Sequence, residues 1–180
     1  MKKIIPIFVF VILVIGIVGI YHFQNNKTVP PSTLSPQNGT YLIDGEKITL
    51  VNGSAEEAVA PDSASKNVFH YFGNEAVGDL NGNNKNDTVF IITEETGGTG
   101  IFYYVAAFLD GTTSTNAVFL GDRIAPQTTE IKNGIIIVNY ADRAPGEPMS
   151  AEPSVAISKY FSVSGTELKE IQNPNLVSAQ

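Results

Sequence analysis

The sequence predicts an all-β fold, a mainly antiparallel sandwich, barrel or bent sheet, that follows one N-terminal transmembrane helix. Beyond residue 40 the apolar residues come in short runs rich in β-branched and aromatic side chains, and Gly, Asn, Asp or Pro bounds each run. Helical periodicity is nearly absent from the same region. Residues 4–20, by contrast, form one uncharged apolar run of membrane-spanning length.

Length and composition limit the chain to one globular domain with an accessory segment. The chain has 180 residues, no cysteine and two histidines. Disulfides, thiol nucleophiles and thiolate zinc sites are therefore excluded, and little is left for an imidazole metal site. Residues 40–180 hold eight basic and eighteen acidic residues, a formal charge of −10. A domain this acidic repels nucleic acid, so we expect no nucleic-acid partner.

We expect residues 1–23 to form a signal-anchor helix. Two lysines precede the seventeen uncharged residues 4–20, which as a helix would be about 26 Å long and would just span a bilayer core. A cleaved secretory signal is the alternative, but it expects a shorter apolar stretch and small residues at the cleavage site. The positive-inside rule then predicts a single-pass protein of the cell membrane, with a cytoplasmic N-terminus and an extracytoplasmic domain.

A stalk is predicted at residues 24–40. This segment holds three prolines, one charge and no large aromatic residue, so it cannot bury enough apolar surface to offset the entropy cost of ordering. Its Pro-Pro and Ser-Pro steps favour an extended chain. The β domain is expected at residues 41–173, with a short C-terminal tail at residues 174–180.

Nine strands are predicted in the domain. The clearest hairpin has its turn at Asp44-Gly45, a step typical of type I′ turns, and Asn52-Gly53, Asn133-Gly134 and Ser164-Gly165 are further turn steps. The continuous apolar runs 89–92 and 135–138 indicate strands covered on both faces. The one helix candidate is residues 55–60, after a serine that resembles a capping box. The strands beyond the hairpin are expected at residues 68–72, 88–93, 101–109, 116–120, 134–140, 155–163 and 167–171.

Oxygen ligands at alternate positions predict a weak calcium-binding loop. They are Asp79, Asn81, Asn83, Lys85 through its carbonyl, and Asp87, at positions 1, 3, 5, 7 and 9 of a tight loop that can curl around a hard cation. A strand follows instead of a helix, and no glutamate stands at position 12, so this is no EF-hand. The alternative is an Asn/Asp-rich turn that its own side-chain to backbone hydrogen bonds hold together without metal.

Two resemblances accompany these residues. The segment GDLNGNNKND (residues 78–87) resembles the calcium loop of FG-GAP and related extracellular repeats, which implies calcium binding by Asp79, Asn81, Asn83 and Asp87. Asn83 and Asn84 depart from that loop, where aspartate and glycine are usual. Phrases within residues 66–165, such as YFGNEAVGDLNGN and NYADRAPGEPM, resemble small uncharacterised bacterial proteins that are membrane-anchored or secreted. That second resemblance implies no activity.

The two arginines of the chain define a second candidate site. Each follows an aspartate, in two loops that hold Asp122, Arg123, Asp142, Arg143 and Glu147. Arginine recognises carboxylate or phosphate bidentately, so a groove between these loops could bind a small anion or a peptide terminus. The alternative is that each arginine ties down its own loop, which suits loops rich in Pro and Gly.

Other patterns carry less weight. Ser63 and Lys66 fit a Ser-x-x-Lys pattern that chance alone would produce. Glu94-Glu95 is interpreted as a solvated turn, because adjacent residues on a strand edge point to opposite sides. His70 lies between aromatic residues and has no serine motif to pair with. Residues 102–104 could form an aromatic platform, but aromatic strand residues usually pack in cores.

These observations favour a membrane-anchored extracytoplasmic β module that is non-enzymatic. The membrane contact is expected through residues 4–20, calcium is the expected cofactor, and an envelope protein or glycan is the expected partner. The alternative is an anchored hydrolase or periplasmic ligand sensor that uses the Asp-Arg loops. A pocket that joins those loops would favour the alternative.

Overall fold

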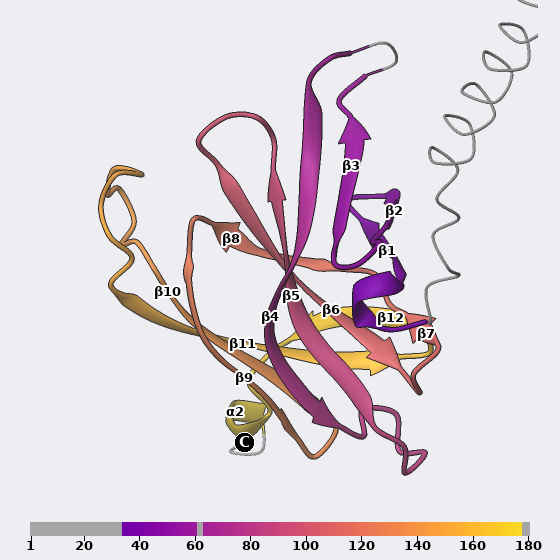
Figure 1. Ribbon diagram of the computed structural model, residues 1–180. Coiled ribbons are helices and arrows are strands. Elements are labelled where there is room, and N and C mark those ends of the chain that lie inside the picture. Colours follow the sequence, from indigo (N-terminus) through magenta and orange to yellow (C-terminus); the bar gives the residue numbers. More distant parts are fainter. Residues whose placement is uncertain (1–33, 61–62, 178–180) are drawn as a thin grey trace, which may run out of the picture. The chain divides into compact units, whose positions relative to one another are not determined.

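The computed structural model describes residues 34–60 and 63–177, which form a β domain within the compact unit Thr33–Gln180. The helix expected at residues 1–23 lies outside the described residues. In the described part, twelve strands form antiparallel sheets of six, four and two strands, and no sheet closes into a barrel (Figure 1). The all-β prediction is therefore confirmed, and a closed barrel is no longer one of its alternatives.

The six-stranded sheet is built on consecutive hairpins. Its long central strands pair over most of their length, and the two short strands at the end both pair with the strand Ile101–Leu109, along successive parts of the same edge. A bulge with positive φ at Gly73 and Asn74 interrupts the longest strand. The strands are β3 (Ser54–Ala58), β4 (Lys66–Gly78), β5 (Asp87–Glu95), β6 (Ile101–Leu109), β7 (Thr113–Ser114) and β8 (Val118–Asp122).

Both faces of β5 are buried, because successive side chains enter two different cores. Val89 and Ile91 belong to the first core, whereas Phe90 and Ile92 belong to the second. All four residues are fully buried, and burying each such side chain contributes about 1.5–3 kcal/mol. The prediction of a doubly covered strand at residues 89–92 is confirmed.

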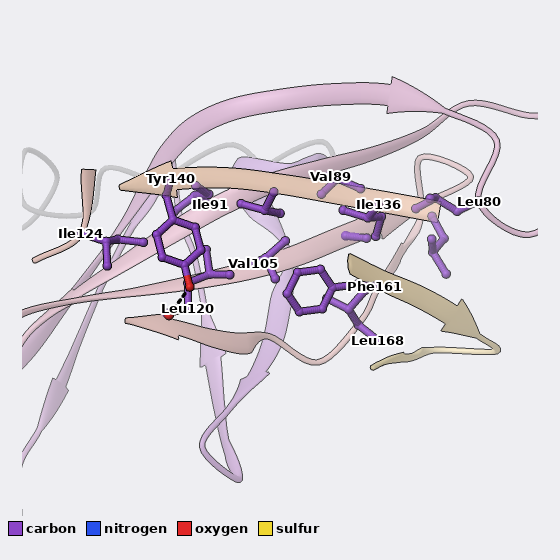
Figure 2. Packing of buried hydrophobic residues seen from close by; sticks show 13 residues of the cluster. Leu80, Val89, Ile91, Val105, Leu120, Ile124, Ile136, Tyr140, Phe161 and Leu168 are labelled. Carbon is purple, nitrogen blue, oxygen red and sulfur yellow. Dashed lines mark hydrogen bonds between the residues drawn. The ribbon is translucent and has the colours of Figure 1, made fainter. Parts of the chain in front are cut away.

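The four-stranded sheet covers the first core from the opposite side. Figure 2 shows Ile136, Tyr140, Phe161 and Leu168 from this sheet packed toward Val105 of β6. Ile135 and Ile137 are only half-buried, so the prediction that residues 135–138 are covered on both faces is wrong: only one face of this strand meets a core. The elements are β9 (Ala125–Lys132), β10 (Ile135–Asp142), β11 (Val155–Ser164), β12 (Glu167–Ile171) and the short helix α2 (Pro174–Val177).

A two-stranded hairpin, β1 (Thr40–Ile43) and β2 (Glu46–Thr49), covers the second core. Its turn has φ values of 48° at Asp44 and 88° at Gly45, as the predicted type I′ turn requires. The 3-10 turn η1 (Pro36–Asn38) precedes it. Residues 36–40, expected in the stalk, are thus part of the domain, since the Gly39 carbonyl accepts a hydrogen bond from the Leu50 N–H (2.9 Å).

Two segments differ from their predictions for local reasons. The helix expected at residues 55–60 is wrong, because Ser54–Ala58 is strand β3 and pairs with β4. A helix of that length cannot stabilise itself, so pairing with a sheet edge prevails. The strand β9 was not predicted, because its sequence APQTTEIK lacks an apolar run and most of its side chains are exposed or half-buried.

Candidate functional site

The loop between β4 and β5 is organised around the carboxylate of Asp79. Its Oδ1 accepts hydrogen bonds from the N–H groups of Asn81 (3.2 Å), Gly82 (2.7 Å) and Asn83 (3.2 Å), and its Oδ2 accepts one from Asn84 (2.8 Å). These donors, with Asn84 first, hold the pKa of Asp79 below its usual range. Asn84 adopts φ 62°, the left-handed conformation that asparagine tolerates.

The asparagine side chains continue the same pattern. Asn81 Oδ1 accepts a hydrogen bond from the Asn83 N–H (3.1 Å), and Asn83 Oδ1 accepts one from the Lys85 N–H (2.8 Å). Asn83 Nδ2 donates to Asp110 Oδ1 (2.7 Å) on the loop that follows β6. The side-chain oxygens of the predicted calcium ligands therefore already accept hydrogen bonds within the protein.

Asp87 lies at the base of this loop and is fully buried. Its Oδ2 accepts a hydrogen bond from the Leu80 N–H (2.8 Å), and its Oδ1 accepts one from the Asp110 N–H (2.9 Å). One carboxylate thus joins the start of the β4–β5 loop to the end of β6. Burial of this carboxyl group is tolerated because both of its oxygens accept hydrogen bonds from backbone N–H groups.

These side-chain to backbone hydrogen bonds are the ones expected of an Asn/Asp-rich turn that holds together without metal. Among residues 34–60 and 63–177, no group of three or more His, Cys, Asp or Glu side chains is placed to hold a metal ion. A calcium ion would have to rely on Asp79, amide oxygens and backbone carbonyls, and would share oxygens that already accept N–H bonds. Calcium binding at Asp79, Asn81, Asn83, Lys85 and Asp87 stays a prediction.

The structure brings the two Asp-Arg loops together. Arg143 Nη1 donates to the Arg123 carbonyl (2.9 Å), and Arg143 Nε donates to the Ala151 carbonyl (2.7 Å). Arg123 forms a bidentate pair with its neighbour Asp122, with Nε to Oδ1 at 3.0 Å and Nη2 to Oδ2 at 2.9 Å. Hydrogen bonding from Arg123 is the main reason why the pKa of Asp122 lies below its usual range.

The remaining acids of this pair of loops also bind nearby backbone. Asp142 Oδ1 accepts the Arg143 N–H (2.7 Å), and Glu147 Oε2 accepts the Ala144 N–H (2.8 Å). Asp142, Glu147 and Arg123 are thus engaged with neighbouring residues, whereas Arg143 bonds to the backbone of both loops. This arrangement matches the interpretation in which each arginine ties down a loop.

The remaining candidate residues, Ser63, Lys66 and His70, lie apart from one another or on an exposed face. Lys66 pairs with Glu56 (2.6 Å), and Ser63 Oγ accepts the Ser65 N–H (3.1 Å), so the Ser-x-x-Lys pattern forms no catalytic pair. His70 Nδ1 lies 3.2 Å from Ser54 Oγ on the exposed face of β3 and β4. Exposed imidazole and hydroxyl groups without a third, orienting group do not make a nucleophilic site.

A third cluster, which the sequence did not reveal, lies at the tip of the β1–β2 hairpin. Tyr104 Oη lies 2.8 Å from Asp44 Oδ2 and 3.0 Å from Glu94 Oε2. Asn67 Nδ2 donates to Glu94 Oε1 (2.9 Å). Glu94 is 8 % exposed, so its assignment to a solvated turn is wrong. Period-2 alternation places it on the face of β5 that carries Phe90 and Ile92, and this pattern was the available signal.

Two adjoining hollows flank this cluster, and together we call them the tip groove. One has a volume of about 400 Å³ and is lined by Asp44, Glu94, Phe102, Tyr104 and Phe119. The other, of about 250 Å³, is lined by Ile43, Asp44, Glu46, Asn67, Phe69 and Glu94. Burial, together with the negative charges of Asp44 and Glu46, raises the pKa of Glu94.

The comparisons with protein-family models, with curated proteins and with solved structures find no match. Within residues 34–60 and 63–177 the one α-helix is far shorter than a membrane span. The membrane anchor expected at residues 4–20 lies outside these residues.

Proposed function

We propose that the chain is a non-enzymatic, membrane-anchored module that holds a rigid acidic β domain outside the cytoplasm, in an envelope-binding or structural role. The observation that supports this proposal is that the charged side chains of the predicted sites form hydrogen bonds within the domain. At both sites predicted from the sequence, these side chains already bond within the protein: Asp79 accepts N–H groups of its own loop, Arg123 pairs with Asp122, and Arg143 donates to the backbone of both Asp-Arg loops. Such side chains serve a scaffold, whereas a catalytic group must remain free to reach a substrate.

The alternative, a hydrolase or ligand sensor at the Asp-Arg loops, has less support. A ligand there would have to displace the Asp122 carboxylate from Arg123, and the two carbonyls from Arg143. Bidentate pairs of this kind are among the stronger hydrogen-bonded contacts of proteins.

Because the chain has no cysteine, its anchoring and orientation can be tested by labelling a single introduced thiol. A single Ser150→Cys substitution, in the exposed loop after β10, gives one thiol on a background of none. We expect a membrane-impermeant maleimide to label this variant on intact cells, and the protein to stay in the membrane fraction after alkaline carbonate washing. Labelling that requires permeabilised cells, or release by carbonate, would contradict the proposed topology.

We further propose that the β4–β5 loop binds calcium weakly, and this needs its own test. At ten times its dissociation constant, calcium should stabilise the full chain by RT ln 11, about 1.4 kcal/mol, relative to a chelator. Two carboxylates predict a dissociation constant of about 10⁻⁴–10⁻³ M. Asp79→Asn should lose the gain, whereas the matched control Glu152→Gln, an exposed site on another loop, should keep it. Equal stability with calcium and chelator would show that the loop is a turn only.

A further inference from the structure

The tip groove combines one buried acid, Glu94, and two exposed acids, Asp44 and Glu46, with exposed aromatic surface. Asp44 and Glu94 line both of its hollows, and Glu46 lines the smaller one. In the described part of the chain, no lysine or arginine forms an ion pair with any of these three acids. Buried carboxylates are normally paired with a cation or fully hydrogen-bonded.

Counting hydrogens shows that the cluster lacks one donor. Both carboxylates lie within hydrogen-bonding distance of the Tyr104 hydroxyl, at 2.8 and 3.0 Å, but a phenol has only one hydrogen to donate. If that hydrogen goes to Asp44, then Glu94 Oε2 faces an oxygen lone pair. Glu94 is more than nine-tenths buried, so a second donor must come from a proton or from a molecule in the groove.

Aromatic rings line the larger hollow beside these oxygens. The Phe119 ring is 45 % exposed, and its centroid lies 5.5 Å from that of Tyr104 and 6.3 Å from that of Phe102. Ring faces attract cations, and they also pack against the methylene groups that carry an ammonium head. The chemistry of the walls thus matches an alkyl chain that ends in a positive charge.

We propose that the tip groove binds an alkylammonium group, with Glu94 and Asp44 as hydrogen-bond acceptors and Phe119 and Phe102 against the alkyl chain. The ammonium supplies the donors that the cluster lacks and neutralises the negative charge of the groove. The raised pKa of Glu94 agrees with this inference, because its causes are the burial and the neighbouring acids that a cation would compensate. The site is independent of the calcium loop.

The alkylammonium group could belong to a free amine or to a lysine side chain. Amide NMR titration of the full chain in a non-ionic detergent distinguishes these sources, with n-pentylamine as one probe and Nα-acetyl-lysine amide as the other. Tight binding of both probes identifies a lysine-bearing partner, and binding of pentylamine alone identifies a small amine. Pentan-1-ol is the uncharged control and should not bind.

We expect pentylamine to cause saturable shifts at residues 43–46, 92–94 and 102–104. Glu94→Gln should weaken binding about tenfold or more, as expected for a charge-assisted hydrogen bond, and Phe119→Ala should weaken it about threefold. Asp44→Asn, in an exposed turn that suits asparagine, should also weaken it, and provides the test if Glu94→Gln fails to fold. Glu152→Gln, with the same change in net charge, should have no effect.

Three results would overturn the proposal. The shifts could fail to saturate for both probes, pentan-1-ol could bind as well as pentylamine, or the Glu94 and Asp44 substitutions could leave the affinity unchanged. The last result would place the amine on the diffuse negative surface of the domain.

Discussion

Replacing Asp87 with alanine tests the most buried carboxylate of the domain. The side chain is fully buried, and its two oxygens accept the N–H groups of Leu80 (2.8 Å) and Asp110 (2.9 Å). Alanine leaves both donors without a partner, at a cost of about 1–3 kcal/mol each. We therefore expect Asp87→Ala to lower the free energy of unfolding by about 3–5 kcal/mol.

Asp79→Ala provides the contrast within the same loop. Asp79 accepts four backbone N–H groups, but those bonds are exposed, so water can replace the lost acceptor. The expected cost is about 1 kcal/mol, less than for Asp87 although twice as many bonds are lost. Asp87→Asn keeps one acceptor oxygen and should fall between the two.

The assay is urea unfolding of the full chain followed by far-UV circular dichroism, with a parallel series in calcium; the values above refer to the series with a chelator. If Asp87→Ala costs less than about 1 kcal/mol under these conditions, the argument from buried unpaired donors is refuted. If the cost appears only when calcium is added, Asp87 is a metal ligand, and the hydrogen bonds are secondary.

Three further substitutions test the fold and the tip groove. Phe161→Ala, at a fully buried ring of the first core, should cost about 3–5 kcal/mol in urea unfolding. Asn116→Ala should cost about 1–2 kcal/mol and raise aggregation on light scattering, because the Asn116 amide donates to the Leu168 carbonyl (3.0 Å) and accepts its N–H (2.7 Å) along the edge of β12. Glu94 faces Asp44, Glu46 and Tyr104, and the fold raises its pKa. Protonated Glu94 therefore stabilises the fold at a pH below the usual glutamate pKa of about 4.3. This stabilisation is lost as the pH rises through the pKa of Glu94 in the folded state. Glu94→Gln should remove that pH dependence from the melting temperature.

Local turn chemistry explains why much of the sheet could be predicted. The steps Asp44-Gly45 and Asn133-Gly134 both have positive φ at their two residues, and each forms the turn that its sequence indicates, between two paired strands. Turn type and register depend on a few neighbouring residues, so a sequence carries them directly. Whether a strand is covered on one face or two depends on distant segments, and the prediction was therefore right for residues 89–92 and wrong for residues 135–138.

The tip groove escaped prediction for a related reason. Asp44 and Tyr104 are sixty residues apart in the chain. In the sequence, Glu94 belongs to the acidic pair Glu94-Glu95, which was interpreted as a solvated turn. Only the packing of the hairpin over β5 and β6 brings the three side chains together. The calcium loop, in contrast, is contiguous, so its residues were identified although their role as ligands stays a prediction.

The hydrogen-bond partners of the acids distinguish those that stabilise the fold from those of the tip groove. Asp79, Asp87 and Asp122 each accept backbone N–H groups from their own loop or from a neighbouring segment, so their carboxyl groups contribute to holding the chain in place. In the described part of the chain the acids of the tip groove form no ion pair, and Glu94, the one of them that is buried, keeps its burial at an electrostatic cost. A domain of formal charge −10 could relieve that cost by exposing Glu94. That it instead packs this side chain against aromatic rings, beside two open hollows, is the strongest reason to look for a cationic ligand there.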